Sequence, residues 1–244
     1  DGPDDQPFLR GYTGYQGPDR LRGVRDMLDT QLAWVEQGID IPSRWIDRCR
    51  QRGVAAWVSL RMNDVHGNEC PDRYDHSTFF KEHPEYRRGP FHASRRQSIA
   101  FDYAHEAVRE HQRRLIEEQL ERYDIDGMEL DFMRMEAYFR VGRELEGTAI
   151  MTAWLEDIRG LVRAAAKRRG HPIQLGVRVA SRPETSRRLG LDTVVLAKKG
   201  LVDIVVPTPS AGAMATGRSA GARRSMIVAS SRRARCSRSI SALS

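Results

Sequence analysis

Two acidic side chains stand close together inside an otherwise apolar run, Asp-Ile-Asp-Gly-Met-Glu-Leu-Asp-Phe-Met-Arg, at residues 124–134. Successive side chains of a β-strand point to opposite faces, so Glu129 and Asp131 share one face and the aliphatic side chains share the other. Neighbouring carboxyl groups are common reagents of general acid–base and nucleophilic catalysis. The run therefore predicts a strand that carries acid toward a polar site.

Two further apolar runs show the same alternation. The run at residues 54–63 leaves Arg61 and Asn63 on its polar face, and the run at residues 173–179 leaves Arg178 there. If each apolar face packs on a helix, the polar faces line the inside of a closed barrel. The polar side chains nearest the carboxyl ends of the strands then gather at one rim, where (β/α) barrels carry their chemistry.

Two arginines, Arg61 and Arg178, are expected beside Asp131 at this rim. Guanidinium groups favour the ionised form of a neighbouring carboxyl group. Asp131 is therefore predicted to act as a nucleophile, a base or a stabiliser of positive charge, and a proton donor has to come from elsewhere. The alternative interpretation is an internal ion-pair network that only satisfies the charges facing the barrel interior.

Three polar residues, Asn63, Asp64 and His66, directly follow the first of these strands. From this position they could engage substrate hydroxyls or a leaving group, although a hydrogen-bonded cluster that caps the loop is an equal alternative. They open a polar and aromatic segment at residues 63–101. Connections of this length in a compact domain tend to be functional.

The chain alternates helical and strand-like patterns, which predicts an α/β fold with a parallel sheet. Helices are expected at residues 44–52, from an N-cap at Asp102 to Tyr123, from a cap at Thr148 to a stop at Gly170, and in segments across 184–199; strands are expected at 54–62, 127–133, 173–179 and 202–206.

The excess of basic residues is confined to the end of the chain. From Pro209 to Ser244 there are seven Arg and no Asp, Glu or Lys. Removing these seven from the 40 Lys and Arg residues leaves a balance with the 33 Asp and Glu residues, so residues 1–208 are formally neutral. The tail, residues 209–244, has no apolar period and cannot build a core, which indicates a disordered basic tail or a chain read out of frame.

Other features exclude several classes of protein. The three Cys residues are an odd number at wide spacing, which argues against a disulfide framework and against a thiolate zinc site, and no metal or other cofactor is predicted. No run approaches the roughly 18–20 consecutive apolar residues that a membrane-spanning helix needs, so no membrane partner is expected. The compartment stays open.

Several motifs taken together resemble a known group of proteins. They are Ser-Leu-Arg-Met-Asn-Asp-Val-His (59–66), His-Pro-Glu-Tyr (83–86), Asp-Tyr-Ala-His (102–105), Tyr-Asp-Ile-Asp-Gly-Met-Glu-Leu-Asp-Phe-Met-Arg (123–134) and Gly-Val-Arg-Val (176–179). Across roughly residues 30–208 this set resembles the bacterial glycosyl-hydrolase-like TIM-barrel proteins, a largely uncharacterised group of family-ten-like glycosyl hydrolases.

This resemblance implies a (β/α)8 TIM barrel that cleaves glycosidic bonds in an oligo- or polysaccharide. Asp131 then becomes the catalytic carboxylate, with Glu129 as the candidate second acid. The residues implied to bind substrate are Arg61, Asn63, Asp64, His66 and Arg178. Aromatic residues of the 63–101 segment could stack on sugar rings or could anchor the segment to the domain.

The chain departs from this pattern in two respects. A typical barrel has eight strands in roughly 250 residues, whereas about four strands are recognisable here, so residues 1–208 are expected to form a barrel that is incomplete at both ends. A glycosidase also needs two carboxyl groups, about 5 Å apart for retention or about 6.5–9.5 Å apart for inversion. Because Glu129 is a neighbour on the same strand, the true partner of Asp131 is expected in the missing part.

The favoured hypothesis is a carbohydrate-active hydrolase that uses Asp131. The first alternative is a non-catalytic saccharide-binding barrel or an inactive barrel fragment, because the second acid is not evident. The second alternative is a protein that binds nucleic acid through the basic tail. It is the weakest of the three because the body of the chain is neutral.

Overall fold

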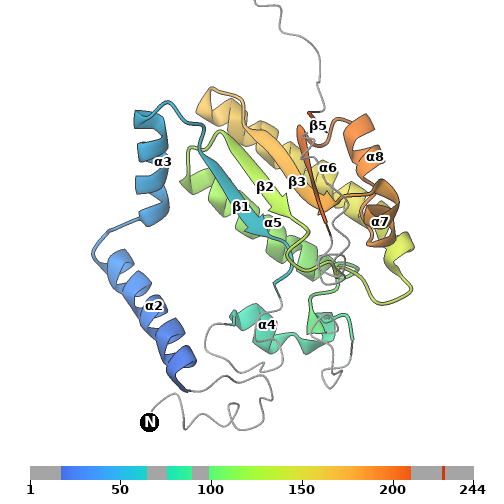
Figure 1. The fold of residues 1–244 in the computed structure, drawn as a ribbon, viewed down its shortest axis with the longest axis horizontal. Coiled ribbons are helices and arrows are strands. Elements are labelled where there is room, and N and C mark those ends of the chain that lie inside the picture. The colour runs from blue at the N-terminus through green and yellow to red at the C-terminus, as the bar shows by residue number, and fades with distance from the viewer. Residues whose placement is uncertain (1–17, 65–75, 90–98, 210–226, 229–244) are drawn as a thin grey trace, which may run out of the picture.

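The computed structural model describes residues 18–64, 76–89, 99–209 and 227–228. Strands β1 (Trp57–Arg61), β2 (Gly127–Asp131), β3 (Gln174–Ala180) and β4 (Ile204–Thr208) form a parallel sheet in the order of the sequence (Figure 1). The short strand β5 (Ile227–Val228) pairs with β4 in the antiparallel direction. The predicted α/β fold with a parallel sheet is confirmed, and the described strands form an open sheet of five strands.

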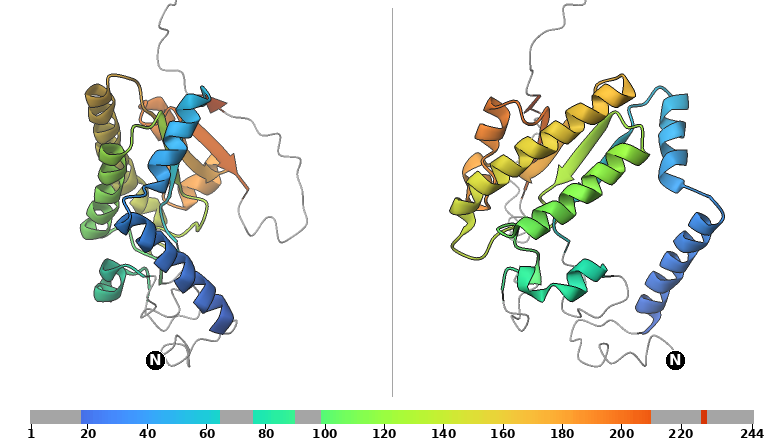
Figure 2. Two further views of the ribbon diagram at one scale, coloured as in Figure 1. Left: turned by 90° about the vertical axis from the view of Figure 1, so that its left-hand side faces the viewer. Right: turned by 180° about the vertical axis from the view of Figure 1, so that it is seen from behind.

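Helices connect the parallel strands and lie mainly on one side of the sheet. Figure 2 shows α5 and α6 side by side along that face, while α2 stands away from the sheet beyond α3. The helices are α2 (Pro18–Glu36), α3 (Ile41–Gln51), α4 (Thr78–Glu82), α5 (Glu106–Arg122), α6 (Glu144–Arg169), α7 (Pro183–Arg188) and α8 (Thr193–Lys198), with a 3-10 helix η2 (Pro84–Tyr86).

The core lies between the sheet and these helices. From the sheet, this core contains Met128 and Leu130 of β2 and Val177 of β3. They are fully buried, as their alternation with polar residues predicts. From the helices, Ile116 of α5 and Ile158 of α6 join the same cluster. Burial of each such side chain contributes about 1.5–3 kcal/mol, so this one-sided core fixes which face of the sheet remains for polar residues.

The predicted cap of each long helix differs from the cap that is observed. Helix α5 begins at Glu106 with His105 at the N-cap, while Asp102 accepts the Ala104 amide at 3.0 Å in the preceding turn. Helix α6 begins at Glu144, so Thr148 lies inside it and donates its hydroxyl to the Leu145 carbonyl at 2.7 Å. The helix dipole favours the observed starts, because acids lie in the first turn of each helix: Glu106 in α5, and Glu144 and Glu146 in α6. The predicted stop at Gly170, with φ of 77°, is confirmed.

Two aspartates join neighbouring strands at the amino ends of the sheet. The Asp126 amide donates to the Ala56 carbonyl at 2.9 Å, and its Oδ2 accepts the Ala56 amide at 2.7 Å. Asp203 repeats this pattern with Leu175, at 2.8 Å in both directions. Each aspartate thus closes a two-way link that sets the register of the strands above it.

The structure also bears on the tail and on membranes. Residues 209–244 lie outside the described part of the chain except for Pro209 and the two residues of β5. Among the helices that the structure describes, none is long and apolar enough to cross a membrane.

Candidate functional site

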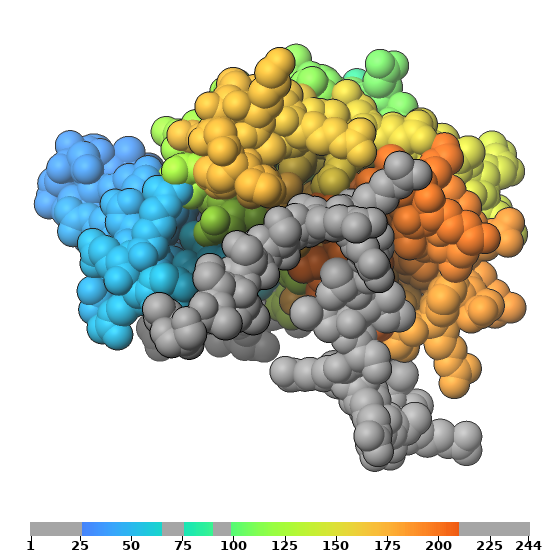
Figure 3. Space-filling model, turned by 90° about the horizontal axis from the view of Figure 1, so that it is seen from above, coloured from blue at the N-terminus to red at the C-terminus, as the bar shows by residue number. Residues whose placement is uncertain are grey.

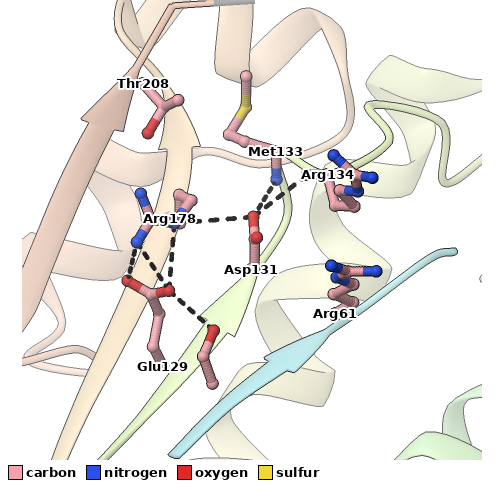
Figure 4. A pocket seen from close by; sticks show the side chains of 8 residues that line it. Arg61, Glu129, Asp131, Met133, Arg134, Arg178 and Thr208 are labelled. Atoms are coloured by element: carbon pink, nitrogen blue, oxygen red, sulfur yellow. Dashed lines mark hydrogen bonds and ion pairs between the residues drawn. The ribbon is translucent and has the colours of Figure 1, made fainter. Parts of the chain in front are cut away.

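A pocket of about 550 Å³ opens on the face of the sheet that the core helices do not cover. Figure 4 shows charged side chains of β1, β2 and β3 converging on it at the carboxyl ends of the strands. The register explains this convergence, since Arg61 pairs with Asp131 and Asp131 pairs with Arg178 across adjacent strands. The lining residues are Ser59, Arg61, Glu129, Asp131, Met133, Arg134, Arg178 and Thr208.

Glu129 is held on both oxygens deep in this pocket. Arg178 donates to Oε1 from Nε at 3.1 Å and from Nη2 at 3.0 Å, and Nη2 also lies 2.9 Å from Oε2. The Ser59 hydroxyl donates to Oε1 at 2.9 Å. A carboxylate with a side-chain exposure of only 14% is stable there because a guanidinium and a hydroxyl satisfy it.

Asp131 is anchored through one oxygen only. Its Oδ1 accepts the Met133 amide at 2.8 Å and the Arg134 amide at 3.2 Å, and Nε of Arg178 lies 3.9 Å from the same oxygen. Within the described part of the chain, Oδ2 accepts no hydrogen bond. The side chain is 17% exposed, so an oriented carboxylate presents one oxygen to the pocket.

Arg61 and Arg134 lie on the other side of Asp131 from Arg178 (Figure 4). Arg61 is half-exposed and pairs with Asp64 at 2.9 Å. Of the predicted substrate-binding residues Arg61, Asp64 and Arg178, the two arginines line the pocket, while Asp64 pairs with Arg61 and is not among the lining residues.

Asn63 is placed differently from the prediction of a rim residue. It is 2% exposed, and its Nδ2 donates to the Phe101 carbonyl at 3.0 Å and to the Ala137 carbonyl at 2.6 Å. Its Oδ1 accepts the Phe101 amide at 3.2 Å. The alternation of faces ends with β1 at Arg61, so Asn63 turns away from the pocket and joins two loops, as the capping alternative predicted. His66 lies outside the described residues.

Two buried tyrosines hold the ends of the strands that carry the site. The Tyr103 hydroxyl donates to the carbonyl of Met62, directly after β1, and the Tyr138 hydroxyl donates to the carbonyl of Phe132, directly after β2. Burial raises the pKa of both phenol groups, which keeps them as neutral donors. Sequence reasoning missed both residues, because their partners lie in other segments of the chain.

A tryptophan forms the floor of the open face. Trp57 of β1 extends across the neighbouring strands, and a Cβ at Gly127 would overlap its indole ring. A Cβ at Gly176 would lie 3.2 Å from Cζ3 of the same ring. The close approach of the indole, which remains 37% exposed, therefore requires glycine at position 127 and leaves little room for a larger side chain at position 176. Ser59 and Glu129, which pair across β1 and β2, lie two residues closer to the carboxyl ends of their strands than Trp57 and Gly127.

The described aromatic residues of the 63–101 segment pack on the domain. Phe79 stacks on His111 of α5 with a centroid distance of 4.1 Å, and Phe80 meets Phe101 edge to face at 5.6 Å. These contacts match the anchoring alternative. Within the described ranges, no group of three His, Cys, Asp or Glu side chains could hold a metal ion.

Comparison with known proteins does not place the chain in a family. A scan against models of protein families gives no match, and a search of curated proteins returns none either. The class that fold and site define is therefore a mixed α/β protein with a parallel sheet and a charged pocket at the carboxyl ends of its strands.

Proposed function

We propose that this chain is a carbohydrate-active hydrolase built as part of a (β/α)8 barrel, in which Asp131 acts on a glycosidic bond. The observation that carries the proposal is the asymmetric anchoring of Asp131 in the pocket. Its Oδ1 is fixed by two backbone amides, while Oδ2 accepts no hydrogen bond from the described residues. A reacting carboxylate needs this combination of fixed orientation and one available oxygen.

Asp131 would serve this reaction in its ionised form. A glycosidic bond breaks through a transition state with positive charge on the sugar ring, which a carboxylate stabilises directly or traps as a nucleophile. Arg178 and Arg61 flank the acid on its two neighbouring strands. The same guanidinium groups, with Arg134, can donate to sugar hydroxyls.

Glu129 has a positioning role in this proposal. Arg178 and Ser59 occupy both of its oxygens. A proton on Glu129 would therefore break its ion pair with Arg178, in a part of the pocket that is largely shielded from solvent. The carboxylate instead fixes the Arg178 guanidinium, which in turn faces Asp131 at 3.9 Å. The proton donor has to be a different group from Glu129.

A second candidate is a saccharide-binding protein that does not hydrolyse its ligand, and the engagement of Glu129 by Arg178 favours it. Most glycosidases use two carboxyl groups on opposite sides of the bond. Among the pocket residues that the structure describes, the acids are Glu129 and Asp131, and Glu129 is engaged by Arg178. A pocket with one available acid can bind a sugar through its arginines without cleaving it.

The test is a panel of aryl glycosides and soluble polysaccharides, with release of product and binding measured on the same samples. The wild-type chain is compared with Asp131→Asn and with Asp157→Asn. Asp157 is a control because it lies on α6 and forms an exposed ion pair with Arg113. We expect turnover in the wild type and in the Asp157 variant and none in the Asp131 variant. Binding without turnover in all three proteins supports the second candidate, and equal turnover in all three refutes the assignment of Asp131.

A further inference from the structure

The pocket at the carboxyl ends of the strands is lined by more positive than negative side chains. Its described lining includes the acids Glu129 and Asp131 and three arginines, Arg61, Arg134 and Arg178. Sites for small molecules are usually lined by apolar and aromatic side chains with a few polar groups among them. Here none of the described lining residues is aromatic. This composition suits recognition of charge better than packing against the face of a neutral ring.

The arginines are brought together by the fold and not by a run of basic sequence. Arg61 ends β1 and Arg178 lies in β3, and the two residues pair with Asp131 from its two sides. In Figure 3, the segment that precedes β1 and the α7–α8 segment that follows β3 lie on opposite sides of the molecule. Positive charges from distant parts of the chain thus converge on one acid, and Arg134 adds a third (Figure 4).

Arg178 and Glu129 compensate each other within this cluster. The guanidinium binds both oxygens of the carboxylate, at 2.9 to 3.1 Å. Among the charged residues that the structure describes in the lining, Arg61 and Arg134 then face Asp131 alone. The lining keeps an excess of one positive charge, and a cleft lined by one sign of charge concentrates ligands of the opposite sign. One bound anion balances the pocket.

Arg61 is able to exchange its present partner for such an anion. Its Nη1 donates to Oδ2 of Asp64 at 2.9 Å, which is the one hydrogen bond of this guanidinium to a described residue. The Arg61 side chain is 53% exposed, and exposed ion pairs contribute little because water screens them. A carboxylate can accept two parallel N–H bonds from one planar guanidinium, so an acid on the ligand can replace Asp64 with better geometry.

We infer that the pocket recognises an acidic sugar, a hexuronic acid residue whose carboxylate binds Arg61 and Arg134. The inference rests on the proposed function, since it takes the ligand to be a glycan and names its class. The volume of about 550 Å³ lies in the range of ligand-binding pockets. The ring of the sugar lies beside Asp131, while its carboxylate balances the excess charge of the lining. A neutral sugar leaves that charge unbalanced, so acidic glycans are preferred.

The first test compares trisaccharides of glucuronate, galacturonate and mannuronate with their carboxyl-reduced counterparts, in which CH₂OH replaces the carboxylate. Each is titrated into the full chain by calorimetry. We expect at least one acid to bind about 10–100-fold more tightly than its neutral counterpart, with a difference that shrinks as salt is added. Equal binding of acids and counterparts, or binding of none, overturns the proposal. Tighter binding of a sulfated neutral trisaccharide than of every hexuronate also overturns it.

A variant of Arg61 tests where the carboxylate binds. Arg61→Gln should lower the affinity for the acid to that for its neutral counterpart, while binding of the counterpart changes much less. Arg114→Gln is the matched control, because Arg114 lies on α5 and forms an exposed ion pair with Glu110. Circular dichroism verifies that both variants fold. A folded Arg61 variant that keeps the full preference for the acid contradicts the assignment, and the wild-type titrations stand without either variant.

Product release, measured in the same samples, separates this inference from the proposed reaction. Preferential binding of a hexuronate without cleavage supports the acidic-sugar site and contradicts the hydrolase. Cleavage of neutral glycans without any preference for acidic ones supports the hydrolase and overturns the acidic-sugar site.

Discussion

At the amino end of β3, both oxygens of Asp203 are engaged, by Arg159 and by the Leu175 amide, whereas at the carboxyl end of β2 Asp131 accepts amides through one oxygen and presents the other to a pocket. The residue type and the sheet are the same at both ends. The difference lies in what surrounds the acid, since the first turns after β2 satisfy only Oδ1 of Asp131. A carboxylate that is completely satisfied stabilises the fold, and one that is half satisfied can bind or react.

Removal of Asp203 should have the largest effect on stability. Arg159 pairs with its two oxygens at 2.5 and 2.9 Å, and the side chains of Arg159 and Asp203 are only 12% and 18% exposed. Asp203→Ala leaves this guanidinium and the Leu175 amide without their acceptor, so the free energy of unfolding should fall by about 3 kcal/mol.

Asp131→Ala is the comparison for that experiment at the other end of the sheet. It removes two backbone contacts and should cost only about 1 kcal/mol. Urea denaturation of both variants gives the two values. Equal losses would mean that the acid in the pocket supports the fold as much as the acid at the amino end does.

The floor of the open face offers the next test. Gly127→Ala places a methyl group in the Trp57 ring, so we expect a loss of about 1–3 kcal/mol in the free energy of unfolding and a shift in tryptophan fluorescence. Gly160→Ala in α6 is the control, because nothing lies within 4 Å of the added atom. That variant should gain about 0.5–1 kcal/mol from helix propensity. If both substitutions stabilise the protein, the indole does not lie on Gly127.

The smallest expected effect is on pH dependence at the amino end. The hydrogen bond that His171 donates to Asp124 raises the pKa of His171, and the same bond, with help from Arg50, lowers the pKa of Asp124. The stabilisation from His171 is present below the ordinary histidine pKa and is lost as the pH rises through the raised value. The stabilisation from Asp124 is present above the ordinary aspartate pKa and is lost as the pH falls through the lowered value.

His171→Gln should therefore lower stability at about pH 5 and leave it unchanged at about pH 9, where His171 is neutral in both states. The loss should stay below about 1 kcal/mol, because both side chains are about one third exposed and solvent screens them. Thermal unfolding of both proteins at the two pH values measures it. A loss of equal size at both pH values would point to packing of the ring.

Much of the arrangement of the site follows from the sequence, because a strand alternates its faces. That rule correctly joined Glu129 and Asp131 and placed Arg61 and Arg178 on the same side. It failed at Asn63, because β1 ends two residues earlier and the chain turns away. Alternation cannot show where a strand stops, and a stop is decided by contacts with other segments.

Contacts between distant segments could not be predicted from the sequence either. Asp126 binds an amide 70 residues away, and Asp203 binds one 28 residues away. The acids look alike in the sequence, yet only the folded arrangement separates those at the amino ends from Asp131. The engagement of Glu129 by Arg178 likewise depends on the pairing of β2 with β3, 49 residues apart.

The most direct test of the role of Asp131 compares Asp131→Asn with Glu129→Gln on a glycan that the wild type cleaves. We predict that the Asp131 variant loses turnover by about 10²–10⁴-fold while its dissociation constant for the glycan changes little. The Glu129 variant should weaken binding together with turnover, because it releases Arg178. The account is contradicted if the Asp131 variant keeps its turnover, or if its binding falls as far as its turnover does.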